Sequence, residues 1–259
     1  MIGPSPDISD LLEQWPYAAG QFNVRLITGN DGEPRIQIRL DLGMLQMHLD
    51  GRPDGKRPEG YGSLLEYFEA RADGIEPPAE GDPTDEQLTL DDADIRSLRE
   101  EASQYYHRYM ALLALEDYDG VIRDTGRNLR MLDFVVKHAD KPDEAQELET
   151  FRPYIMMVRA RARASRSLKD NEPKAAVLAI DEGLDALRTH FEGRGELEQF
   201  EQSNEAELLR QMKSSLLPRL PVSQTAELRE RLRAALAQEN YELAAILRDE
   251  LRMLGEERS

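Results

Sequence analysis

The amino-acid sequence predicts an α+β protein that is mostly helical. Between residues 22 and 40, apolar residues alternate with polar ones, which is the period of a half-buried β-strand. From residue 94 onward, apolar residues recur at steps of three and four, which is the period of an amphipathic helix. Aromatic residues make up only 6% of the chain, so we expect a core built mainly from aliphatic side chains.

A small N-terminal unit is predicted over residues 1–72. Residues 8–15 favour a short amphipathic helix that ends before Pro16, and its expected inward side chains are Ile8, Leu11, Leu12 and Trp15. Residues 22–40 predict a β-hairpin with one buried face, turning at Gly29–Gly32. Residues 44–49 either continue the second strand or form a third one. An isolated hairpin is marginally stable in water, so another element must cover its apolar face.

The best candidate for that cover is a helix that opens at Leu64. Ser63 precedes it as a possible N-cap, with Glu66 three residues further on. The loop from Asp50 to Gly62 is polar and rich in Pro and Gly. Loops often carry function, so its charged side chains are candidate ligand contacts, although an ordinary solvated loop fits equally. These side chains are Arg52, Asp54, Lys56 and Arg57.

An acidic linker is predicted over residues 73–93. Residues 73–94 hold nine acidic side chains, no Lys or Arg, and three prolines. Such a composition is typical of a solvated spacer between units. The alternative is that it attracts a basic partner.

A helical bundle is expected over residues 94–217. Its predicted helices lie near 94–115, 118–138, 144–169, 173–191 and 195–213. A weak internal repeat has an offset of 55 residues and aligns five pairs of apolar side chains. The pairs are Leu113 with Leu168, Val121 with Ala176, Ile122 with Val177, Leu129 with Leu184, and Leu132 with Leu187. The joints of the two hairpins loosely resemble those of tetratricopeptide repeats, but that family's period is about 34 residues. An ordinary helical bundle is the open alternative, and the acidic stretch Asp140–Glu149 is expected to interrupt the run.

The chain is predicted to end in a helical hairpin, set apart by Pro218 and Pro221. In the first helix, from about Ser223 to Gln238, Leu228, Leu232 and Ala235 share one stripe. The second helix starts near Asn240, a suitable N-cap. Its expected inner face comprises Ala244, Ala245, Arg248, Leu251 and Leu254. A module this short usually needs a partner or a second copy for stability, which indicates an interaction role.

The run from Glu239 to Leu251 resembles the signature of the UVR domain, the UvrB/UvrC motif. It has an aromatic-Glu pair, two alanines, and then Leu-Arg-Asp-Glu-Leu, while Leu228 and Leu232 match the first helix. The resemblance covers residues 223–257 and implies a hairpin that pairs with a second copy. The family links excision-repair subunits and recurs in Clp-type ATPases and in regulators of arginine-directed protein kinases. By resemblance, Tyr241 lies at the partner contact or staples its own hairpin, and Arg248 with Asp249 sets the register.

Composition and motifs argue against several kinds of chemistry. Cysteine is absent, which excludes disulfides and thiolate sites, and the four histidines are scattered without metal-ligand spacing. Neither a nucleotide-binding P-loop nor a nuclease signature is present, so we expect no cofactor, no metal and no enzymatic activity. The start has no secretory character and no run is long enough to span a bilayer, so a cytoplasmic protein without a membrane contact is expected.

One cluster of positive charge stands out in a chain of net charge −18. Arg152, Arg159, Arg163 and Arg166 are spaced to share one helix face. They are a candidate patch for an anion or nucleic acid, or else they pair with acidic residues of the same chain. The overall negative charge disfavours nucleic acid without excluding it. The sequence therefore predicts a non-enzymatic adaptor that docks a protein partner or itself through the terminal hairpin. The alternatives are a DNA-repair accessory protein and, with less support, an enzyme of unrecognised type.

Overall fold

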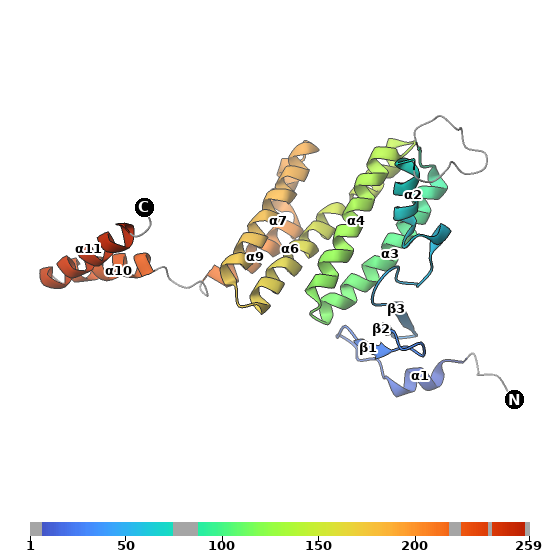
Figure 1. The fold of residues 1–259 in the computed structure, drawn as a ribbon, viewed down its shortest axis with the longest axis horizontal. Coiled ribbons are helices and arrows are strands. Elements are labelled where there is room, and N and C mark those ends of the chain that lie inside the picture. Colours follow the sequence, from blue (N-terminus) through green and yellow to red (C-terminus); the bar gives the residue numbers. More distant parts are fainter. Residues whose placement is uncertain (1–6, 75–87, 218–223, 238–239, 257–259) are drawn as a thin grey trace. The chain divides into compact units, whose positions relative to one another are not determined.

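The computed structural model describes residues 7–74, 88–217, 224–237 and 240–256 (Figure 1). The chain divides into two compact units, Met1–Lys213 and Ser214–Ser259, each of which is described by itself. The fold is mostly helical with a small antiparallel sheet near the N-terminus, as predicted. The segment predicted as an N-terminal unit lies in the same compact unit as the helices of the bundle.

The sheet has three strands in the order β1-β2-β3, namely β1 (Val24–Thr28), β2 (Pro34–Arg39) and β3 (Met44–His48). Ile36 pairs with Leu26 on one side and with Met47 on the other, so the apolar residues share one face. The predicted turn is present, since the Gly29 N–H donates to the Glu33 carbonyl at 2.7 Å. The hairpin is confirmed, and residues 44–49 supply a separate third strand.

Strand β2 is buried on both faces, whereas the sequence predicted one buried face. Gln37, on the polar face, accepts from Arg25 Nε at 2.8 Å and donates to Gln46 at 2.7 Å. The Arg25 guanidinium lies 4.1 Å from the Trp15 ring, just beyond helix α1 (Ser9–Gln14). The side chains of this polar face hydrogen-bond to one another and are covered. The alternation of apolar and polar residues in the sequence therefore does not reveal that this face is buried.

Helix α1 exists as predicted, but its expected inward face is only partly formed. Leu12 and Trp15 are half-buried, whereas Ile8 and Leu11 are exposed. The helix contains only six residues. One and a half turns present too short a stripe to bury all four apolar side chains.

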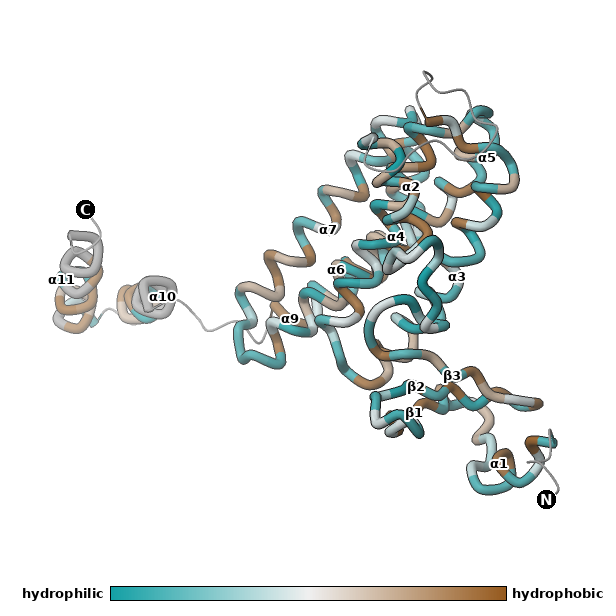
Figure 2. The backbone as a smooth tube through the Cα atoms, turned by 45° about the vertical axis from the view of Figure 1, so that its right-hand side comes forward, coloured by the Kyte–Doolittle hydropathy of each residue, from teal (hydrophilic) through white to brown (hydrophobic). Residues whose placement is uncertain are grey.

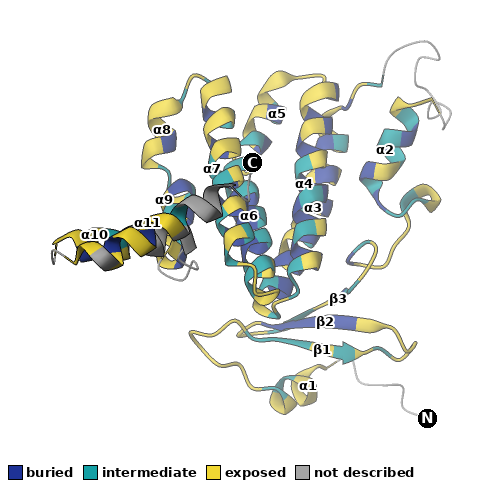
Figure 3. Ribbon diagram, turned by 60° about the vertical axis from the view of Figure 1, so that its left-hand side comes forward, coloured by how far each residue is buried: buried dark blue, intermediate teal, exposed yellow. Residues whose placement is uncertain are grey.

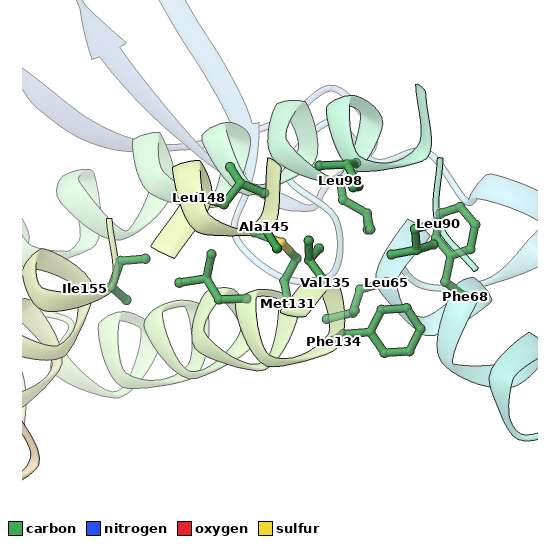
Figure 4. Packing of buried hydrophobic residues seen from close by; sticks show 12 residues of the cluster. Leu65, Phe68, Leu90, Leu98, Met131, Phe134, Val135, Ala145, Leu148 and Ile155 are labelled. Atoms are coloured by element: carbon green, nitrogen blue, oxygen red, sulfur yellow. The ribbon is translucent and has the colours of Figure 1, made fainter. Parts of the chain in front are cut away.

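Helix α2 (Leu64–Ala72) is capped as predicted, with the Ser63 hydroxyl accepting from the Glu66 N–H at 3.2 Å. It does not cover the hairpin, so that prediction was wrong. Its Leu65 and Phe68 pack instead into the core of the helices that follow (Figure 4). Helix α3 is the helix that packs against β2.

The bundle begins with α3 (Asp92–Ala114), α4 (Tyr118–His138), α5 (Pro142–Glu149) and α6 (Arg152–Lys169). It continues with α7 (Pro173–Gly193), α8 (Leu197–Gln202) and α9 (Asn204–Leu216). Hydrophobic and hydrophilic residues alternate along α6 and α7, as their amphipathic period requires (Figure 2). Adjacent helices α3 and α4, α4 and α6, and α6 and α7 pack against one another.

Two predicted helices are each broken in two. The helix expected over 144–169 ends at Glu149 and restarts at Arg152, with Pro153 in the first turn of α6. Proline lacks an N–H and suits the first turn, so the break falls just before it. The helix expected over 195–213 breaks at Ser203, whose hydroxyl accepts from the Ala206 N–H at 3.2 Å. The stretch Asp140–Glu149, expected as a spacer, is mostly helix α5.

The internal repeat of 55 residues is confirmed by the two helix-to-helix turns. Asp117 donates its N–H to the Leu112 carbonyl at 2.9 Å, and Glu172 donates to the Ser167 carbonyl at 2.8 Å. Glu116 and Asn171 hold φ angles of 57° and 61° in these turns. Each turn is thus a Schellman motif with a left-handed residue. In each of the five aligned apolar pairs, both side chains are buried or both are half-buried. The likeness to tetratricopeptide repeats stays a prediction, because α5 interrupts the succession of hairpins.

The C-terminal end of the predicted acidic linker is ordered. Leu90 is fully buried, donates its N–H to the His138 carbonyl at 2.7 Å and accepts from the Asp140 N–H at 3.0 Å. Asp91 then caps α3 by accepting from the N–H groups of its first turn. Residues 88–93 therefore anchor the bundle, while 75–87 lie outside the described residues.

Candidate docking site

The C-terminal hairpin consists of α10 (Gln224–Ala237) and α11 (Tyr241–Glu256), which pack against each other. Asn240 closes the connection between them, because its N–H donates to the Ala235 carbonyl at 2.9 Å. Its side chain accepts from the Leu243 N–H at 3.2 Å, which confirms it as the N-cap of α11. The sequence thus encodes both the end of the turn and the start of the second helix.

The described core of the hairpin is small. Ala235, Ala244 and Leu247 are buried, with Leu232 and Leu251 half-buried against them. The two alanines let the helix axes approach closely, and Leu247 fills the space between them. A module of this length usually needs a partner or a second copy for stability.

A second set of large apolar side chains faces outward. Leu236 is 50% exposed, Leu243 37% and Ile246 56%, and Tyr241 is more exposed still. Leu243 and Ile246 lie three residues apart, so they share one face of α11 beside its buried stripe. Exposed residues cover much of both helices (Figure 3). The hairpin therefore carries an apolar surface that is separate from its own core.

The structure divides the predicted partner-binding residues into three groups. Leu232, Ala244 and Leu251 belong to the hairpin's own core, and Tyr241 is exposed at the start of α11. Leu228 and Leu254 lie in helices, but their side chains lie outside the described residues.

Ala245 and Arg248 were predicted on the inner face of α11, and both are exposed. Each follows a buried residue directly and so is turned about 100° away from the buried stripe. The stripe passes through Leu247 instead, which the sequence interpretation missed.

The outward residues Leu236, Leu243 and Ile246 were also missed. The signal for Leu243 and Ile246 was present, because residues 243 and 246 form a second i, i+3 stripe beside 244 and 247. A helix with two adjacent apolar stripes can bury only one of them in a two-helix hairpin. The second stripe is the candidate docking surface.

The predicted arginine patch is largely engaged within the chain. Arg152 pairs with Asp133 and Glu149, each at 2.7 Å. Arg163 pairs with Glu182 at 2.6 Å, and Arg166 pairs with Asp119 at 2.8 Å.

Three of the four arginines, Arg159, Arg163 and Arg166, line one groove of about 570 Å³. Arg152 does not line that groove, so the four do not form a single patch. Asp170, Glu172 and Glu182 line the same groove and balance its charge. For Arg152, Arg163 and Arg166, the geometry therefore fits the interpretation that the arginines pair within the chain.

Within the polar loop, Arg52 is half-buried and pairs with Glu101 at 2.8 Å and with Asp54 at 2.7 Å. Lys56 and Arg57 are exposed. The structure thus uses Arg52 to hold the loop in place.

Glu101 is the centre of a buried network that the sequence did not reveal. Besides Arg52, it pairs with Arg127 and accepts from the Leu64 N–H at 2.7 Å. Burial lowers the pKa of Arg127 to about 9, which still leaves the guanidinium charged at neutral pH. The network joins the loop, the start of α2, α3 and α4.

A second buried pair lies nearby on the same helices. Arg108 donates to Asp124 at 2.7 and 2.8 Å, and also to the Gly51 carbonyl at 2.7 Å. The partners in both networks are far apart in sequence, so neither network has a local signature.

Among the described residues, acidic and histidine side chains nowhere gather in threes as a metal site would require. The helices in the same part of the chain are too short or too polar to cross a membrane.

Comparison of the chain with curated proteins and with solved structures found no match in either case. The family model described as the UvrB/uvrC motif (UVR) does match, over residues 223–257. The matched segment contains both helices of the hairpin and its outward apolar stripe. The C-terminal hairpin is therefore similar to the UvrB/uvrC motif, as the run from Glu239 to Leu251 predicted.

Proposed function

We propose that the chain is a protein-interaction adaptor without catalysis of its own, and that its terminal hairpin docks onto a second helical hairpin. The observation that carries this proposal is the exposed stripe of Leu243 and Ile246, with Leu236 on the other helix. The match to the UvrB/uvrC motif supports it, because that motif occurs in protein-interaction contexts as well as in DNA-repair proteins.

The energetics favour a partner for this surface. Burying an apolar side chain contributes about 0.8 kcal/mol for each methylene group removed from water. Covering the three half-exposed side chains would add on the order of 3 kcal/mol to the stability of this short hairpin. A second hairpin offers the same kind of apolar stripe, so two such surfaces can cover each other.

A double substitution in the full-length protein tests the proposal. Replacing Leu243 and Ile246 with Ser removes the outward stripe and leaves Ala244 and Leu247 in the core. We expect lower mass by light scattering if the protein self-associates, or loss of captured partners if the second hairpin belongs to another protein. Ala245→Ser is the matched control, because it adds a hydroxyl at an exposed position of the same helix. Identical mass and identical partners in the double variant and the wild type would contradict the proposal.

A DNA-repair accessory role has less structural support. It would use the arginine helix as a nucleic-acid contact, yet Arg152, Arg163 and Arg166 already pair with acidic side chains. Phosphate binding would require breaking these pairs in a chain of net charge −18.

A further inference from the structure

A cavity of about 370 Å³ lies among helices α3, α4, α5 and α6. Aliphatic side chains form part of its lining, among them Met131, Leu148 and Ile155, which Figure 4 shows near one another. Three tyrosines, Tyr106, Tyr109 and Tyr154, form an aromatic part. A cavity of roughly 150 Å³ can hold a benzene ring, so this one admits a ligand of two fused rings.

The break between α5 and α6 gives the cavity its opening. Leu148 at the end of α5 and Ile155 in the first turns of α6 both line it, and Phe151 lies between them. Phe151 is 48% exposed although it is a large aromatic residue. Tyr106, on the opposite side, is also exposed. Two exposed aromatic side chains thus frame an apolar interior, which is typical of a ligand pocket.

Three polar side chains of the lining, Arg99, Tyr109 and Tyr154, are candidates to contact a ligand. Tyr109 lines the cavity and is only 1% exposed. The Tyr154 hydroxyl reaches only the Met110 sulfur, at 3.5 Å. Arg99 contacts Glu147 at 3.4 Å, which is long for a charged pair. A ligand oxygen that accepts from the Tyr109 hydroxyl gains a hydrogen bond inside the cavity.

These groups also define the chemistry of the ligand. Arg99 is a pure donor, and burial raises the pKa of Tyr109, so its hydroxyl keeps its proton and can donate. The lining contains no Asp or Glu, which disfavours a cation. The Asn128 amide is already occupied, since it donates to the Ala102 carbonyl at 3.0 Å and accepts from Arg127 at 3.1 Å.

We infer that this cavity binds a free small molecule with an apolar ring body and an oxygen acceptor, such as an aromatic carboxylate. The ring packs between the tyrosines and the aliphatic side chains. The carboxylate accepts from the Tyr109 hydroxyl or from Arg99 at the opening. The site is separate from the docking stripe of the terminal hairpin.

The experiment uses 2-naphthoate as the probe, titrated into the full-length protein and followed by calorimetry and ligand-observed NMR. We expect saturable binding of 2-naphthoate and at least tenfold weaker binding of 2-naphthylmethylammonium, which has the same rings and a positive charge. No binding at millimolar concentration, or equal binding of the cation, would overturn the inference.

Variants locate the binding. Tyr109→Phe removes the hydroxyl that would donate to the ligand and should weaken 2-naphthoate binding by about three- to tenfold. Tyr105→Phe is the matched control, because Tyr105 is also buried on α3 but does not line the cavity. Ala102→Phe fills the cavity and should abolish binding, with thermal unfolding confirming that the variant is folded. Equal affinities for the Tyr109 and Tyr105 variants would overturn the assignment.

One further comparison distinguishes binding of a small molecule in the cavity from binding of a protein side chain. The Leu243→Ser, Ile246→Ser double variant should keep wild-type affinity for 2-naphthoate. Ala102→Phe should keep the partners captured by the wild type. If Ala102→Phe instead loses a protein partner while 2-naphthoate fails to bind the wild type, the pocket receives a protein side chain and the inference is wrong.

Discussion

Single buried residues hold the polar loop from Asp50 to Gly62 against the helices of the bundle. Glu101 has no exposed surface and is surrounded by the guanidinium groups of Arg52 and Arg127 and by the Leu64 N–H. A buried carboxylate is tolerated only when it is paired and hydrogen-bonded, and these groups meet that requirement. Its partners lie 49, 26 and 37 residues away, so only the folded chain brings them together.

Glu101→Gln tests this network. The substitution keeps the shape of the side chain but leaves the buried Arg127 without its paired carboxylate and leaves Arg52 with Asp54 alone. We expect the free energy of unfolding to fall by about 3 to 5 kcal/mol, measured by urea denaturation. Glu100→Gln, at the exposed neighbouring position, should change it by less than about 0.5 kcal/mol. Equal effects of the two substitutions would show that the network does not stabilise the fold.

At the scale of elements, a glycine allows close packing between α6 and α7. Gly183 of α7 faces Ala160 of α6, and a Cβ atom at residue 183 would lie only 2.4 Å from the Ala160 Cβ. The absence of a side chain thus lets α6 and α7 approach closely. Gly126 of α4 is also helical, but a Cβ there would meet only Arg159 Nε at 3.8 Å, an ordinary contact.

The two glycines predict opposite outcomes for the same substitution. Gly183→Ala forces α6 and α7 apart and should lower the free energy of unfolding by about 1 to 3 kcal/mol. Gly126→Ala should raise it by up to about 1 kcal/mol, because alanine is the better helix former and has room. Thermal or urea denaturation distinguishes the two. A stabilising Gly183→Ala would mean that α6 and α7 do not require this close contact.

For the whole molecule, the division into two compact units predicts how truncation acts. Residues 1–217 retain every helix from α1 to α9 and all of the first unit, Met1–Lys213. We expect this fragment to unfold within about 2 °C of the main thermal transition of the full-length protein, measured by calorimetry, because less than about 1 kcal/mol is lost. A fall of more than about 5 °C in the unfolding temperature would show that the hairpin stabilises the first unit.

The elements that could be predicted from the sequence are those whose structure depends on residues close together in the chain. The hairpin turn at Gly29–Gly32, the caps at Ser63 and Asn240, and the two matching turns at Glu116 and Asn171 depend on residues within one turn of each other. The UVR-like run was recognised for the same reason. Errors of boundary arose where one local signal was overlooked, as with Pro153, which follows the break between α5 and α6.

The sequence by itself determined the fold class, the 55-residue repeat and the similarity of residues 223–257 to the UvrB/uvrC motif. Only the tertiary structure decided which apolar stripe of α11 lies inside the hairpin and which faces outward. It also decided that α2 packs with the helices, that Arg152, Arg163 and Arg166 of α6 pair with acidic side chains, and that Tyr109 lines a cavity. The physical reason is that periodicity and capping act between near neighbours, whereas burial and ion pairing depend on residues that only folding brings together.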